Sequence, residues 1–157
     1  MTPALILRKA RTLARRSKLE KVWFLPVFVL LGLARLALLI APFRRIAPHL
    51  GVMNPDGPAI PLATRAQMSR AYRLGRLIEA TAAITPWQSK CLAQAMVAAL
   101  ALRVHRIPYL LCLGVAKDEA KGLKAHAWVA TDRVAVTGGR SFLGFAVVGA
   151  FEYGGNE

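Results

Sequence analysis

Cys91 and His126 are the two residues of this 157-residue chain whose types and settings could support covalent chemistry. Cys91 opens a run of good helix formers that continues to Arg103, and Ser89 is the predicted N-cap of that helix. In the first turn of a helix, the macrodipole and the free backbone N–H groups favour an anion, and Lys90 acts in the same direction. The setting therefore favours the thiolate, which is the nucleophilic form of cysteine.

His126 lies near the start of the alternating run 124–130, whose β-branched and aromatic residues predict a strand. A histidine beside an activated cysteine can withdraw the thiol proton and then donate it to a leaving amine. Taken alone, Cys91 would be interpreted as a small core residue and His126 as a structural one. Together they indicate a nucleophile and its general base.

The other cysteine and histidines are less suited to catalysis. Cys112 lies within the apolar run 109–113, which predicts a core position. His105 is expected at the end of the Cys91 helix, about 20 Å from Cys91 at a rise of about 1.5 Å per residue, where a basic residue interacts favourably with the helix dipole. His49 adjoins a proline-rich segment. No group of cysteines and histidines has zinc spacing, so neither a metal nor another cofactor is expected.

A third group must orient His126, and the residues leave several candidates open. Asp132 is the first acidic residue after His126, but six residues of extended strand span about 20 Å at about 3.3 Å per residue. We therefore expect Asp132 in a hairpin turn, with His126 facing the stretch from Thr137 to Gly139 on the returning strand. Thr137, a backbone carbonyl of that stretch, or an acid from elsewhere could then hold the ring.

The elements around these residues predict an α+β fold. A helix is expected over residues 63–83, ended by Thr85-Pro86 and followed by the Cys91 helix. The expected strands are 109–116, 125–131, 133–137 and 142–153, with the first of them central. A cysteine-bearing helix packed on an antiparallel sheet that carries the histidine is the layout of papain-like and transglutaminase-like enzymes.

The N-terminal part differs from this core in composition. Three regions are expected: a basic and apolar helical segment over 1–47, a linker rich in proline and glycine over 48–62, and the catalytic core over 63–157. Residues 22–41 are nearly all apolar and long enough to span a membrane, although Arg35 would cost about 2.5–3.5 kcal/mol near the bilayer centre. We expect a helix buried against the core or a partner, with peripheral membrane contact through residues 4–41 as the alternative.

The net charge of +14 favours acidic partners: an acidic peptide or protein, an anionic lipid surface, or nucleic acid. Nucleic acid is the weakest of these, because no recognised binding motif accompanies the basic residues, and no nucleic-acid partner is expected. Two cysteines in dissimilar settings do not indicate a disulfide. This favours a cytoplasmic location, with membrane association as the alternative.

Several short motifs between Leu74 and Gly139 resemble, in order and spacing, those of the lasso-peptide leader peptidases, which are transglutaminase-like cysteine proteases. The motifs are Pro86-Trp87-x-x-x-Cys91-Leu92-x-Gln94-Ala95, Arg106-Ile107-Pro108, Leu113-Gly114-Val115, Ala125-His126-Ala127-Trp128-Val129 and Val136-Thr137-Gly138-Gly139. The resemblance implies a transglutaminase-like core with Cys91 and His126 as catalytic residues. The family is described with a Cys-His-Asp triad, and no carboxylate lies on the returning strand opposite His126, which leaves the third role open.

By this resemblance, the protein removes the leader from a ribosomally made lasso-peptide precursor, and its partners are a separate leader-recognition protein and an ATP-dependent lasso cyclase. Two other functions are open. The same Cys-His pair could transfer acyl groups, as in a transglutaminase or an amidase, with an isopeptide or free ammonia as product. Alternatively, the chain could be a non-catalytic, membrane-associated scaffold in which both residues are structural.

Overall fold

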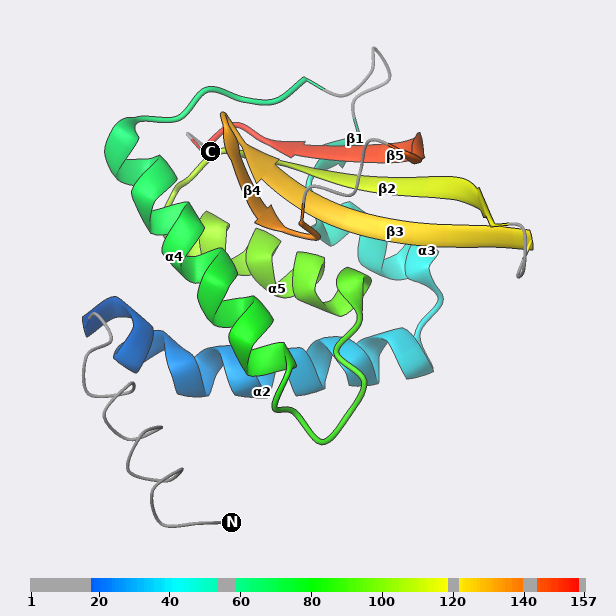
Figure 1. Cartoon of the computed structure of the whole chain (residues 1–157), viewed down its shortest axis with the longest axis horizontal. Helices are drawn as coiled ribbons and strands as arrows, with labels where there is room; N and C mark the ends of the chain where they lie inside the picture. The colour runs from blue at the N-terminus through cyan, green and yellow to red at the C-terminus, as the bar shows by residue number, and fades with distance from the viewer. Residues whose placement is uncertain (1–17, 54–58, 119–121, 140–143, 156–157) are drawn as a thin grey trace.

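The fold places helices against one face of an antiparallel sheet, as the computed structural model in Figure 1 shows. The structure describes residues 18–53, 59–118, 122–139 and 144–155. Its helices are α2 (Lys18–Ile40), α3 (Phe43–Ile46), the 3₁₀ helix η1 (Ala47–His49), α4 (Arg65–Ala82) and α5 (Cys91–Val104). Its strands are β1 (Val52–Met53), β2 (Tyr109–Asp118), β3 (Gly122–Thr131), β4 (Val134–Thr137) and β5 (Ala146–Tyr153). The predicted α+β class, with the Cys91 helix packed on an antiparallel sheet, is confirmed.

The strands follow the order β1-β5-β2-β3-β4, and every neighbouring pair is antiparallel. β2 is central, as predicted, and its residues Leu111 and Cys112, which face opposite sides of the sheet, are both buried. β3 pairs with β2 along its whole length, so that His126 lies opposite Gly114. β4 is shorter and pairs with β3 only at Val129–Thr131.

The segment between α2 and α4 is attached to the core by strand pairing and by hydrogen bonds. β1, which lies within the proline-rich stretch 48–62, adds an edge strand to β5. The Tyr109 hydroxyl donates a hydrogen bond of 2.7 Å to the Leu50 carbonyl. Residues 54–58 lie outside the described part of the chain.

α4 and α5 form the helical layer beneath the sheet. Thr64 and Gln67 form a capping box that starts α4. The Gln67 N–H donates to the Thr64 hydroxyl at 3.2 Å, and the Thr64 N–H donates to the Gln67 side-chain oxygen at 2.9 Å. Gly75 lets α4 approach β4, because a Cβ at this position would lie 1.9 Å from the Val136 carbonyl oxygen. This close packing fixes the position of β4 and of the residues that follow it.

α2 packs against α4 and α5 through one narrow face, and only Val27, Leu31 and Ala34 of this helix are buried. As expected, α2 therefore lies against the core, but it does so through this face alone, and its outer face is exposed. α2 is long and apolar enough to cross a membrane by length and composition. Most of the predicted basic helix before it, residues 4–17, lies outside the described residues.

His105 lies at the end of the Cys91 helix, as predicted. It is the C-cap of α5, and its ring lies 5.1 Å from that of Trp23 on α2. Its Nε2 is buried and has no hydrogen-bond partner within the described ranges. Burial lowers the pKa of His105 below its usual 6.5, and the positive charge of Arg70 lowers it further. Burial and the charge of Arg70 therefore both disfavour the protonated ring.

Because the folded state disfavours protonated His105, the unfolded chain binds this proton first as the pH falls. The free energy of unfolding is therefore expected to decrease as the pH falls below about 6.5. In His105→Gln, chemical unfolding between about pH 7 and about pH 5 should show a smaller loss of stability than in the wild type. Equal losses in the two proteins would contradict this role of His105.

Candidate active site

Cys91 is the first residue of α5 and is half-buried against the hydrophobic core. The N-cap is Lys90, whose side chain makes no capping hydrogen bond. Gln94 is the first residue of α5 whose N–H finds a partner, the Lys90 carbonyl. Among the described residues, none accepts from the N–H groups of Cys91, Leu92 or Ala93. Three N–H donors with no partner in the described part of the chain therefore lie in the first turn of the helix, at and next to Cys91.

The expectation that Ser89 caps this helix is wrong. Its hydroxyl lies 2.8 Å from the hydroxyl of Thr85, which in turn lies within 3.1 Å of the Ala82 and Trp87 carbonyl oxygens. Thr85 has one proton to donate and two carbonyls in reach, so it accepts from Ser89. The Gln94 amide donates to the Ser89 carbonyl at 2.7 Å, which makes Gln94 a brace for the loop. These bonds hold the loop that precedes Cys91 and leave the helix start uncapped.

Trp87 anchors the same loop to α2. Its ring packs edge-on against Phe28 with centroids 5.0 Å apart. It also lies on Gly32, where a Cβ would come within 3.0 Å of the Trp87 ring. The N-terminal helix thus supports the loop that leads into Cys91.

His126 is half-buried on β3 and is held by a backbone carbonyl, one of the orienting groups expected from the sequence. Its Nε2 lies 2.8 Å from the Gly138 oxygen. A carbonyl oxygen can only accept, so Nε2 carries the proton of the neutral ring and Nδ1 keeps its lone pair. Trp128 stacks on the ring at 5.9 Å and Phe145 lies at 5.1 Å. The ring is therefore fixed in the tautomer of a base that acts through Nδ1.

Two glycines make this arrangement possible. Gly138 has a φ of 87°, and a Cβ there would lie 2.6 Å from the Trp128 Cβ. Gly114, directly opposite His126 on β2, leaves space for the Trp128 ring and the Phe145 Cβ, since an added Cβ would meet them at 2.8 and 2.9 Å. A side chain at either glycine would displace the aromatic residues around His126.

The elements that carry Cys91 and His126, α5 and β3, are in contact with each other, but the two side chains are not joined. α5 packs on β3 and β4, and Figure 1 shows its first turn below β3 near the end of β4. His126 shares a face of the sheet with Trp128, whereas Ala127 and Val129 belong to the core with the helices. Within the described part of the chain, no hydrogen bond joins the Cys91 thiol to His126. Their catalytic pairing stays a prediction.

Asp132 is the turn residue that the sequence predicted. It has a φ of 46° between β3 and β4, a backbone conformation that aspartate tolerates. Its carboxylate accepts from the Ala63 N–H at 3.2 Å, and its own N–H donates to the Pro61 carbonyl at 3.0 Å. Asp132 therefore ties the hairpin to the segment before α4 and is not bonded to His126. Thr137 is buried on β4, and its hydroxyl has no partner among the described residues.

Cys112 occupies the predicted core position, with 2% of its surface exposed. Burial, followed by the charge of Glu152, raises the pKa of its thiol to about 11. Cys112 is therefore a protonated thiol at neutral pH.

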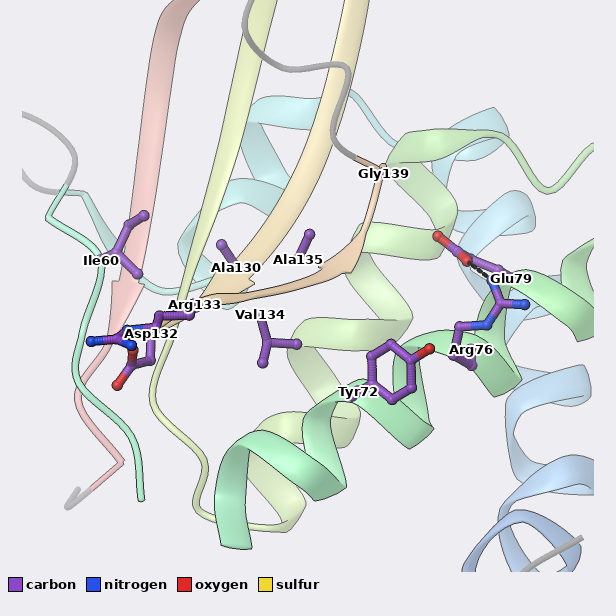
Figure 2. Close-up of a pocket in the computed structure, with 10 residues that line it drawn as sticks. All are labelled: Ile60, Tyr72, Arg76, Glu79, Ala130, Asp132, Arg133, Val134, Ala135 and Gly139. Atoms are coloured by element: carbon purple, nitrogen blue, oxygen red, sulfur yellow. Dashed lines mark hydrogen bonds and ion pairs between the residues drawn. The ribbon is translucent and has the colours of Figure 1, made fainter. Parts of the chain in front are cut away.

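Two hollows of similar size lie outside the candidate pair. One of about 610 Å³ lies between α4 and β4. Figure 2 shows the Tyr72 hydroxyl on the side of Arg76, which pairs with Glu79 at 3.3 Å. The other, of about 650 Å³, is more apolar and lies between the α3–η1 segment and the sheet, where Leu113 lines it. Leu113 pairs with Ala127, and both lie on the face of the sheet that packs against the helices, opposite His126.

A helix that opens on a half-buried cysteine, packed on an antiparallel sheet that carries a histidine, defines the class of papain-like and transglutaminase-like folds. The family model of the transglutaminase-like superfamily matches residues 30–149, which is more than half of the chain. The protein therefore belongs to this superfamily, whose members are generally cysteine proteases and acyltransferases. No curated protein and no solved structure matches the chain.

The two cysteines should differ in reactivity in the folded protein. Near neutral pH, iodoacetamide is expected to alkylate Cys91, because Cys112 is buried and its pKa of about 11 keeps it protonated. Peptide mass spectrometry of wild type, Cys91→Ala and Cys112→Ala would identify the modified residue. Equal labelling of both cysteines before unfolding would contradict the assignment.

Gly138 and Gly139 form a matched pair that tests the His126 contact. Both have positive φ angles, of 87° and 64°, but only at Gly138 does an added Cβ meet other atoms. Gly139→Ala should cost only the backbone strain, about 1–2 kcal/mol, whereas Gly138→Ala should cost more and move the ring. The imidazole NMR signals of His126 should therefore shift in Gly138→Ala and stay in place in Gly139→Ala. Unchanged His126 signals in both variants would refute the contact.

Proposed function

We propose that the protein is a cysteine peptidase that removes the leader peptide from a lasso-peptide precursor. Superfamily membership fits a cysteine peptidase or an acyltransferase in general. The observation that carries the chemistry is the uncapped helix start at Cys91, where three N–H groups have no partner within the described residues. The choice of a lasso precursor is supported by the order of the sequence motifs between Leu74 and Gly139.

The first step is activation of the thiol. Nδ1 of His126 withdraws the proton of Cys91 while Nε2 stays bonded to the Gly138 carbonyl. In this proposal the thiol meets the ring past the edge of β3 when substrate is bound, at residues 126–128, where β3 has no β4 partner. In free enzymes such contacts are often long and become short only when substrate binds.

The second step forms a thioester. The Cys91 thiolate attacks the carbonyl carbon of the scissile peptide bond, and the resulting oxyanion accepts hydrogen bonds from the N–H groups at the start of α5. Protonated His126 donates its proton to the leaving amine, so the core peptide departs and the leader stays bonded to the sulfur. Water then enters, gives a proton to His126 and adds hydroxide to the thioester carbonyl, which releases the leader acid and restores the thiol.

The chain would receive its substrate from partners. We propose that a separate leader-recognition protein presents the precursor and that an ATP-dependent lasso cyclase acts on the released core peptide. The apolar hollow beside Leu113, lined also by Phe43 and Phe151, offers a place for an apolar side chain of the extended substrate.

The direct test is cleavage of the precursor by the purified full chain together with the leader-recognition protein, followed by mass spectrometry. Wild type should release the leader and the core as separate masses. Cys91→Ala should abolish cleavage, and His126→Ala should slow it by about 10²–10⁴-fold, as expected for loss of a general base. Cys112→Ala, which removes the core thiol, is the matched control and should cleave at close to the wild-type rate.

The products separate this function from its rivals. Addition of an amine-bearing compound and recovery of an amide-linked product in place of the free leader acid would identify an acyltransferase. Cleavage by Cys91→Ala at the wild-type rate would make Cys91 structural and end the catalytic proposal.

A further inference from the structure

The outer face of α2 carries a continuous apolar stripe that the domain does not cover. The stripe consists of Val22, Leu25, Val29, Leu33, Leu36, Leu39 and Ile40, each between 48% and 74% exposed. The steps of three and four residues keep these side chains on one face of the helix. From Val22 to Ile40 the stripe is about 27 Å long at a rise of about 1.5 Å per residue. Soluble proteins rarely leave an apolar surface of this extent open to water.

The opposite face of α2 is occupied by the protein itself. Val27 and Leu31 are fully buried, and the loop before Cys91 packs on Gly32 through Trp87. A helix that crosses a bilayer would have to expose all its sides to lipid or to other membrane helices. α2 cannot do so without leaving α4 and α5, so its geometry fits a helix that lies in the plane of a membrane surface.

The composition of the stripe also favours lipid over a protein partner. Its side chains are aliphatic, with no hydrogen-bonding group along its length. Energetically important positions in protein interfaces are enriched in Trp, Tyr and Arg and poor in Leu and Val. Protein interfaces also carry about one hydrogen bond per 100–200 Å². A purely aliphatic surface matches the acyl region of a bilayer better.

Basic residues lie at both ends of the stripe. Lys18 is exposed in the first turn of α2, and Arg44 and Arg45 are exposed just beyond its last turn. Arg35, which lies between the ends of the stripe, is half-buried and does not interrupt it. The seventeen residues before α2 add five basic residues and no acidic one to the sequence. Such flanking charges attract the headgroups of anionic lipids.

We propose that the protein docks on an anionic lipid surface through this stripe, with α2 lying in the plane of the interface. Figure 1 shows α2 on the side of the helical layer that faces away from the sheet. The docked domain therefore presents the sheet toward the aqueous phase. The proposal is independent of the peptidase activity, since it rests on the surface of α2 alone.

The experiment is flotation of the full chain with vesicles of phosphatidylcholine alone or mixed with phosphatidylglycerol. Wild type should bind the mixed vesicles, and Leu33→Glu/Leu36→Glu should lower the partition by at least about tenfold. The matched control is Leu62→Glu/Leu123→Glu, at two exposed leucines outside α2, which should bind as wild type does. Thermal unfolding of each variant verifies that surface substitutions left the fold intact.

The charges are tested with a second pair of variants. Lys18→Glu/Arg45→Glu should weaken binding to the mixed vesicles by at least about tenfold. Arg65→Glu/Lys117→Glu makes the same change in net charge away from α2 and should have a smaller effect.

The proposal is overturned if wild type floats with neither kind of vesicle, or if the Leu33→Glu/Leu36→Glu variant binds as wild type does. Equal binding of wild type to both kinds of vesicle would refute the anionic preference. If the wild type is a dimer that does not bind vesicles, and Leu33→Glu/Leu36→Glu is a monomer, the stripe is instead a contact with a second copy of the chain.

Discussion

The candidate site depends on the hydrogen bond between His126 and the Gly138 carbonyl, at 2.8 Å. This bond fixes both the orientation of the ring and the nitrogen that carries the proton. The carbonyl is placed by backbone packing: Gly75 allows α4 to lie against β4, and Gly138 makes its turn at a φ of 87° beside Trp128. A main-chain oxygen thus orients the ring, and it stays neutral at every pH.

The cysteine side of the site depends on a different set of contacts. Thr85 and Gln94 hold the loop before Cys91 through hydrogen bonds, while Trp87 ties this loop to α2. The family match begins at residue 30, whereas Trp87 contacts both Phe28 and Gly32, so this support spans the start of the matched region. The N-terminal helix is therefore part of the structure that presents Cys91. The same helix carries the exposed stripe, which would place the site at a fixed orientation to a lipid surface.

The periodicity of the sequence was sufficient to predict α4, α5, the central β2 and the hairpin of β3 and β4, because each pattern follows from local burial. Asp132 was predicted correctly as a turn residue, because six residues of extended strand would place it about 20 Å from His126. His105 was predicted correctly at the end of α5, whereas Ser89 was mispredicted as its N-cap. For Ser89 a contact that local rules do not contain was stronger, the hydrogen bond with the Thr85 hydroxyl. The burial of α2 also depends on tertiary packing, which composition does not specify.

The most direct test of the central claim is rapid-quench mass spectrometry of the wild-type protein mixed with precursor and leader-recognition protein. The proposed chemistry predicts a transient species in which the leader is bonded as a thioester to the peptide that contains Cys91. The species should form before free leader accumulates and should be absent from Cys91→Ala. Efficient cleavage of the precursor with no adduct on Cys91 at any time would contradict the account.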